Sequence, residues 1–93
     1  MSSTVYKWML NDIGEGELKG VTELVEDESG WGMDMVYNGW KKMCLRIAED
    51  HGRQPVLESG YDVSATEDKP NSYHTMKIMG TDIVIGTLEV FYK

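Results

Sequence analysis

The stretch DMVYNGWKKMCLRIAEDH, Asp34 to His51, carries the clearest secondary-structure signal in the chain. Its apolar residues recur at the spacing of an α-helix that has one apolar face. They are Val36, Trp40, Met43 and Ile47, and the face is widened by Tyr37, Cys44 and Ala48. Asp34 can cap the first turn, and Gly52 can take the left-handed conformation after the last turn. The pattern predicts one long amphipathic helix over about 34–51.

The segments before and after this helix alternate between apolar and polar residues, as strands with one buried face do. The predicted strands are 5–10, 57–66, 73–79 and 83–92. Short turn-forming segments separate the last three, so we expect those three to form an antiparallel meander. The predicted fold class is α+β: an antiparallel sheet of three to five strands with the helix packed on one face.

Residues 15–26 fit two different elements. Leu18, Val21, Leu24 and Val25 follow a helical spacing with glutamates opposite them, which predicts a second short helix at 15–26. The glycines of this segment weaken such a helix by about 1 kcal/mol each in its interior. A strand over 17–25 is therefore the alternative, and the sequence leaves both open.

Size and composition indicate a single globular domain over residues 1–93, since 41% of the residues are hydrophobic. The one cysteine, Cys44, excludes an internal disulfide and a four-cysteine zinc site, which favours a reducing compartment or an oligomer. The N-terminal residues lack a secretory signal pattern, and no apolar run is long enough to span a bilayer. We therefore expect a cytoplasmic protein.

Negative charge is concentrated in NDIGEGELKGVTELVEDESGWG, residues 11–32. This segment holds seven carboxylates and one lysine, so it carries −6 of the chain's net charge of −7. Such a charge disfavours direct binding to nucleic acid or to anionic membranes, and it favours a basic protein surface as partner. Apolar residues beside charged ones are typical of interfaces. The predicted partner-binding residues are Glu15, Glu17, Glu23, Glu26, Asp27, Glu28 and Trp31.

The pentapeptide DIGEG, residues 12–16, resembles the opening of the lipoyl domains of 2-oxo acid dehydrogenase acyltransferases. That resemblance implies a flattened β-barrel and a lipoylated lysine on a later hairpin. No Asp-Lys-Ala triplet follows in this chain, so no residue matches that lysine, and the helical stretch 34–51 departs from an all-β family. No residue role is carried over from it.

Catalytic chemistry has little support in the sequence. Cys44 lies on the apolar stripe of the helix, and His51 lies about two helical turns, or some 10 Å, away from it. His74 alternates with apolar residues, as a half-buried histidine in a strand does. No phosphate-binding glycine-rich loop is present, and the acidic residues do not have the spacing of a calcium loop. We expect no catalytic residues, no metal and no cofactor.

The leading hypothesis is a non-enzymatic acidic interaction protein that binds a basic, nucleic-acid-binding surface of another protein. Small phage inhibitors of host defence or transcription, such as anti-CRISPR and anti-restriction proteins, are similar to it in size and charge. One alternative is an oligomer, such as a homodimer, that sequesters a small molecule at a subunit interface lined by aromatic and methionine side chains. Another is a structural subunit of a larger assembly.

Overall fold

The computed structural model of the chain describes residues 3–13, 15–25, 31–62 and 69–92. The elements are, in chain order, β1 (Ser3–Asp12), β2 (Gly16–Val25), α1 (Trp31–Asp50), β3 (Pro55–Tyr61), β4 (Ser72–Ile78) and β5 (Val84–Tyr92). Within the described residues, no helix is both long enough and apolar enough to cross a membrane.

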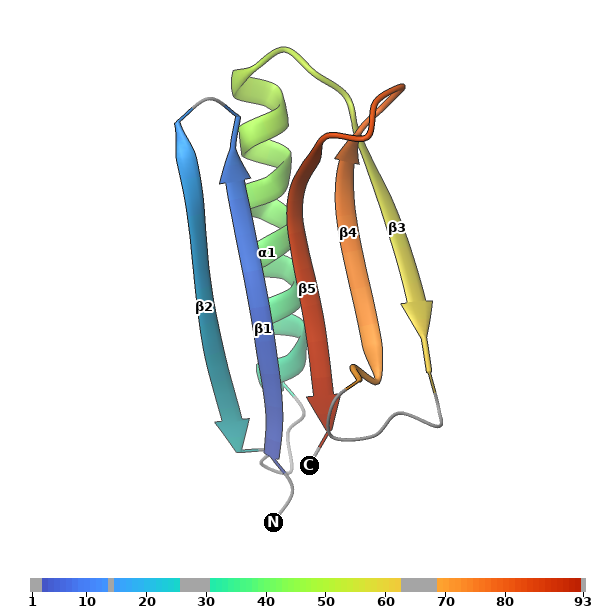
Figure 1. Ribbon diagram of the computed structural model, residues 1–93. Helices are drawn as coiled ribbons and strands as arrows, with labels where there is room; N and C mark the ends of the chain where they lie inside the picture. The colour runs from blue at the N-terminus through green and yellow to red at the C-terminus, as the bar shows by residue number, and fades with distance from the viewer. Residues whose placement is uncertain (1–2, 14, 26–30, 63–68, 93) are drawn as a thin grey trace.

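The five strands form one antiparallel sheet in the order β2-β1-β5-β4-β3. The first and last strands of the chain are therefore neighbours in the middle of the sheet. Strand β2 lies on one side of that pair, next to β1, and strands β4 and β3 lie on the other, next to β5. Helix α1 lies on one face, roughly along the strands (Figure 1). The predicted α+β class, with a helix packed on an antiparallel sheet, is confirmed.

Of the two elements that the sequence left open here, the second helix at 15–26 is wrong and the strand is correct, because residues 16–25 form strand β2. This strand pairs with β1 along its whole length, with Leu18 opposite Leu10 and Gly20 opposite Trp8. Glycines are unfavourable inside a helix but tolerated in a strand whose neighbour covers them. The β1 partner supplies the backbone hydrogen bonds that a helix would have made internally.

Helix α1 begins at Trp31, so Asp34 lies within its first turn and is not the cap that the sequence suggests. The other end of the helix agrees with the prediction. Gly52 has a φ of 63°, and its N–H donates to the carbonyl of Glu49 at 3.0 Å. The N–H of Arg53 donates to the carbonyl of Ala48 at 2.8 Å. These two bonds form a Schellman motif that satisfies the last carbonyls of the helix.

The core lies between α1 and the sheet. It consists of Tyr6, Leu10, Trp40, Cys44, Ala48, Met76, Ile78, Ile85, Leu88 and Val90. The helix approaches β5 closely at Gly86, where an added Cβ would lie 2.6 Å from the Cys44 sulfur and 2.8 Å from the Met9 carbonyl oxygen. The indole N–H of Trp40 donates to that same Met9 oxygen at 3.4 Å.

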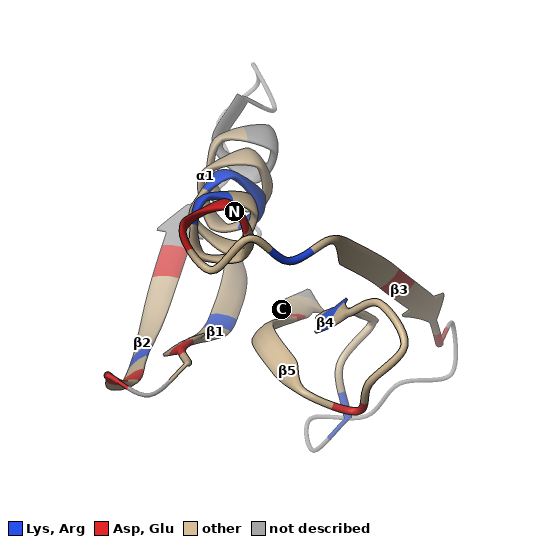
Figure 2. Cartoon of the chain, turned by 90° about the horizontal axis from the view of Figure 1, so that it is seen from above, with Lys and Arg blue, Asp and Glu red and all other residues tan. Residues whose placement is uncertain are grey.

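A single helix does not cover the full width of this sheet. A helix with its side chains is about 10 Å across, and five strands at about 4.8 Å spacing extend over roughly twice that width. Helix α1 packs chiefly on the central strands β5 and β1, and less on β4 and β3. Strand β2 therefore extends beyond the helix, as the view along the helix shows (Figure 2).

Candidate functional site

The turn between β1 and β2 lies beside the C-terminal end of α1. His51, the residue after the helix, contacts the Asp12 carboxylate through its Nε2 atom at 2.9 Å. The turn itself is closed by the Glu15 N–H, which donates to the Asp12 carbonyl at 2.8 Å. Residues far apart in the sequence are thereby brought to one end of the molecule, where Asp and Glu residues lie both on the β1–β2 turn and at the end of α1 (Figure 2).

A hollow of about 520 Å³, open to solvent, lies at this end between α1 and the β1–β2 hairpin. Its apolar lining consists of Leu10, Leu18, Met43 and Ile47. Its charged lining consists of Asp12, Glu15, Glu17 and Asp50 together with one base, Arg46. We call these nine residues the acidic groove. The groove exists because β2 extends beyond the helix and leaves apolar side chains of both elements uncovered.

The apolar part of the groove continues along the helix. A smaller hollow of about 110 Å³ is lined by Trp8, Leu10, Val36, Trp40 and Met43. The two hollows share Leu10 and Met43 and therefore adjoin. Leu18 is 57% exposed and Met43 is 50% exposed, although both are large apolar side chains. The surface changes from acidic at the hairpin end to apolar towards Val36.

The backbone of α1 adds to the negative potential of the hairpin end. The C-terminal end of a helix carries a partial negative charge, which Lys or Arg in the last turn normally offsets. The last turn of α1 contains no basic residue and has Glu49 and Asp50 instead. Among the described residues, Glu15 and Asp50 form no ion pair, and Glu17 pairs with the exposed Lys19 at 2.9 Å. The charge at this end is therefore only partly neutralised.

The structure brings together two of the seven predicted partner-binding residues, Glu15 and Glu17, which line the groove. Glu23 is exposed near the other end of β2, about 20 Å from Glu17 by strand geometry. Glu26, Asp27 and Glu28 lie outside the described residues, as does the side chain of Trp31.

Three charged residues of the groove are absent from the sequence-based set: Asp12, Arg46 and Asp50. The sequence does carry one signal that could have indicated Asp50. Acidic residues in the last turn of a helix oppose its dipole, and such locally unfavourable choices are concentrated at functional sites.

The buried polar residues of the core are placed for packing. Cys44 is fully buried, and this burial raises the pKa of its thiol to about 12. A thiol that stays protonated is a poor nucleophile. His74 is also buried and packs edge-on against the Tyr37 ring at 4.9 Å, with Nδ1 2.7 Å from the Ser59 hydroxyl. Loss of hydration on burial lowers the pKa of His74.

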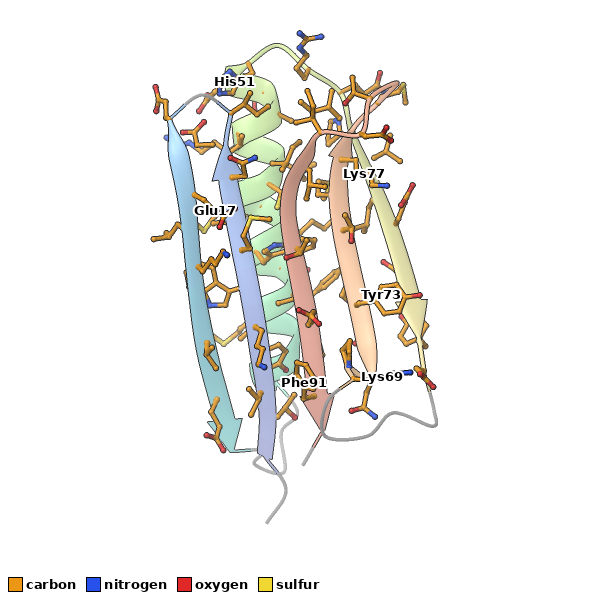
Figure 3. The ribbon with its side chains drawn as sticks, in the orientation of Figure 1. Glu17, His51, Lys69, Tyr73, Lys77 and Phe91 are labelled. Carbon is orange, nitrogen blue, oxygen red and sulfur yellow. The ribbon has the colours of Figure 1, made fainter. Side chains whose placement is uncertain are left out.

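The sheet face that α1 leaves open carries a third hollow, of about 550 Å³, over β2, β1 and β5. Its charged lining is balanced, with Lys7 and Lys19 against Glu17 and Glu89. Further along this face the Tyr73 ring lies towards β3, and Lys77 pairs with Glu58 at 3.2 Å (Figure 3). Balanced charge gives this face no preference for a partner of either sign.

In the described part of the chain, His, Cys, Asp and Glu side chains form no group of three or more that could hold a metal ion.

Comparison with known proteins adds no relative: no protein-family model, no curated protein sequence and no solved structure matches this chain significantly.

Proposed function

We propose that this protein is a non-enzymatic interaction module that docks its acidic hairpin end on a basic surface of another protein. The observation that carries the proposal is the convergence of Asp12, Glu15, Glu17 and Asp50 on one open groove that contains a single base. These residues come from β1, the turn, β2 and α1, so the fold itself gathers them. Opposite charge on the partner would accelerate association and select the partner.

Two features argue that this charge serves binding more than folding. The acidic residues of the last helical turn oppose the helix dipole, so they cost stability where they are. The groove also exposes Leu18 and Met43 beside the charges, and exposed apolar side chains within a polar rim are typical of interaction sites. One concrete form of the proposal is an inhibitor that places carboxylates where a nucleic-acid-binding protein accepts phosphates.

The experiment is affinity purification from the cells in which the protein occurs, with elution in steps of increasing salt. The test variant combines Glu15→Gln, Glu17→Gln and Asp50→Asn. The control removes the same number of charges elsewhere, by Glu58→Gln, Asp82→Asn and Glu89→Gln. The control is matched in one further respect, because Glu17 and Glu58 each form one ion pair with a lysine.

We expect a partner that the wild type and the control variant retain and that the test variant loses. Its retention should fall steeply between about 0.05 and 0.3 M salt, since surface charges are screened over that range. A partner retained equally by both variants would contradict the proposal.

A second candidate function is the sequestering of a small apolar molecule. The observation that favours it is the hollow lined by Trp8, Val36, Trp40 and Met43, which has aromatic and methionine walls. At about 110 Å³ this hollow is smaller than the roughly 300 Å³ or more of ordinary ligand pockets. A ligand would therefore need the adjoining groove or a second subunit, and it would reveal itself by raising the melting temperature.

A further inference from the structure

We infer that the occupant of the acidic groove is a basic amphipathic helix of the partner protein, with cationic side chains at one end and an apolar face along its length. This inference rests on the proposed function and specifies the chemistry of the partner. A flat basic surface would satisfy only the carboxylates. The groove also contains an apolar strip, and only an apolar occupant would remove that strip from contact with water favourably.

The order of residues along α1 sets the distribution of charge in the occupant. Asp50 and Arg46 line the hairpin end, Met43 lies at the point where the two hollows adjoin, and Val36 lines the other end. From Val36 to Asp50 the helix rises about 21 Å, the length of a helical segment of about 14 residues. The occupant should therefore carry Lys or Arg beside the Asp50 end and apolar residues towards Val36.

The position of the groove favours a helix over an added strand. The unpaired backbone groups of edge strand β2 point outward in the plane of the sheet, where a strand would bind. The groove lies instead between α1 and the β1–β2 hairpin on the helix-covered face, and Glu17 at its rim also lines the hollow of the open face. An occupant there meets side chains, and an amphipathic helix presents apolar residues every three to four positions to such a surface.

The charge of the groove also excludes other occupants. A second copy of this chain carries a net charge of −7 and would bring more negative charge to an acidic groove. Nucleic acid and anionic lipid would be repelled in the same way. Of the macromolecules that present apolar and cationic groups together, a basic amphipathic helix matches both parts of the lining.

The test uses two fluorescently labelled synthetic peptides of about 14 residues, the length that spans the acidic groove and the adjoining smaller hollow. The first carries leucines on one helical face and lysines at one end. The second has the same composition, scrambled so that no apolar face forms. Binding to the full chain is measured by fluorescence anisotropy for the wild type and for two matched variants, Met43→Gln and Met79→Gln. Met43 and Met79 are 50% and 54% exposed, so the two changes are alike except for their place.

We expect the amphipathic peptide to bind more tightly than the scrambled one by about ten-fold or more, the gain from burying one or two apolar side chains. Met43→Gln should remove most of that difference, and Met79→Gln should leave it unchanged. Leu18→Gln, on the opposite wall of the groove, should act like Met43→Gln. Agreement between the two variants would show that the loss of binding does not come from misfolding of one of them.

Equal binding of the two peptides, or equal effects of the two methionine variants, would overturn the inference. The variant with Glu15→Gln, Glu17→Gln and Asp50→Asn separates this failure from a failure of the proposed function. If that variant weakens binding of both peptides while the methionine variants act alike, electrostatic docking stands and the helical occupant falls. If it weakens neither, the proposed function falls as well.

Discussion

The indole ring of Trp8 lies across Gly20 of the neighbouring strand, so closely that a Cβ on Gly20 would overlap the ring. Its Nε1–H donates to the Thr22 hydroxyl at 3.3 Å on the same strand. The opposite edge of the sheet has the same arrangement, because Tyr73 of β4 lies across Gly60 of β3. Each edge strand thus has a glycine covered by an aromatic side chain of its inner neighbour. This pairing fixes the register and shields the edge backbone.

Gly20→Ala should therefore destabilise the protein, although alanine is intrinsically favoured over glycine in a strand by about 0.5–1 kcal/mol. The new methyl group displaces Trp8, and overpacking of this kind costs about 1–3 kcal/mol. Urea unfolding measures the loss, and a change in tryptophan fluorescence should accompany it. Gly39→Ala is the control, because a Cβ at this helical position meets no atom within 4 Å. It should add about 1 kcal/mol of stability. If both substitutions raised the free energy of unfolding, close packing of Trp8 on Gly20 would not be what stabilises this edge.

The pairing of Trp8 with Gly20 also explains why residues 16–25 could not be assigned from the sequence. The spacing of Leu18 and Val21 is compatible with a helix as well as with a strand. The deciding factor is β1, which offers a partner to every residue of the segment and an aromatic ring to its central glycine. The glycine-rich turn between two alternating segments was the available signal for a hairpin. This signal competed with the helical spacing of the apolar residues in 18–25.

The candidate site shows a different limit of sequence reasoning. The sequence shows directly that acidic residues are concentrated in 11–32, and this concentration is enough to identify Glu15 and Glu17. The groove itself depends on where α1 lies across the sheet, because a helix centred on β1 and β5 leaves β2 uncovered. Asp50 and Arg46 join the site through that placement, which no local pattern encodes.

Cys44 should resist thiol reagents in the folded protein. It is fully buried beside Gly86, and its pKa of about 12 leaves almost no thiolate at neutral pH. Labelling with a disulfide reagent near pH 8 should therefore be slow in native buffer and fast in denaturant. Gly86→Ala should accelerate native labelling, because the added Cβ pushes against both the sulfur and the rigid backbone at Met9. Rapid labelling of the native wild type would contradict this description of the core.

His74 should make the protein less stable in mild acid. Its side chain faces Tyr37 and Trp40 on α1 and Ser59 on β3, and burial there lowers its pKa below the ordinary 6.5. Below pH 6.5 the unfolded chain binds a proton that the folded chain does not, so the free energy of unfolding falls as the pH falls towards the folded-state pKa. Urea unfolding at about pH 7.5 and pH 5.5 measures the change, and an NMR titration assigns it. A His74 pKa at or above 6.5 would contradict the prediction.

Asp50→Lys should make the protein more stable and a weaker binder at the same time. A cation at the last position of α1 favours the negative end of the helix dipole, by about 0.3–1 kcal/mol at an exposed site. The same change removes one carboxylate from the acidic groove and adds a positive charge there. The control is Asp82→Lys, an equal charge reversal in the exposed loop before β5, which should leave both quantities near their wild-type values. Urea unfolding gives the stability, and the gain should shrink at about 1 M salt, where the screening length falls to roughly 3 Å. If Asp50→Lys lowers the free energy of unfolding, the carboxylate supports the fold, and the argument that it is retained for binding fails.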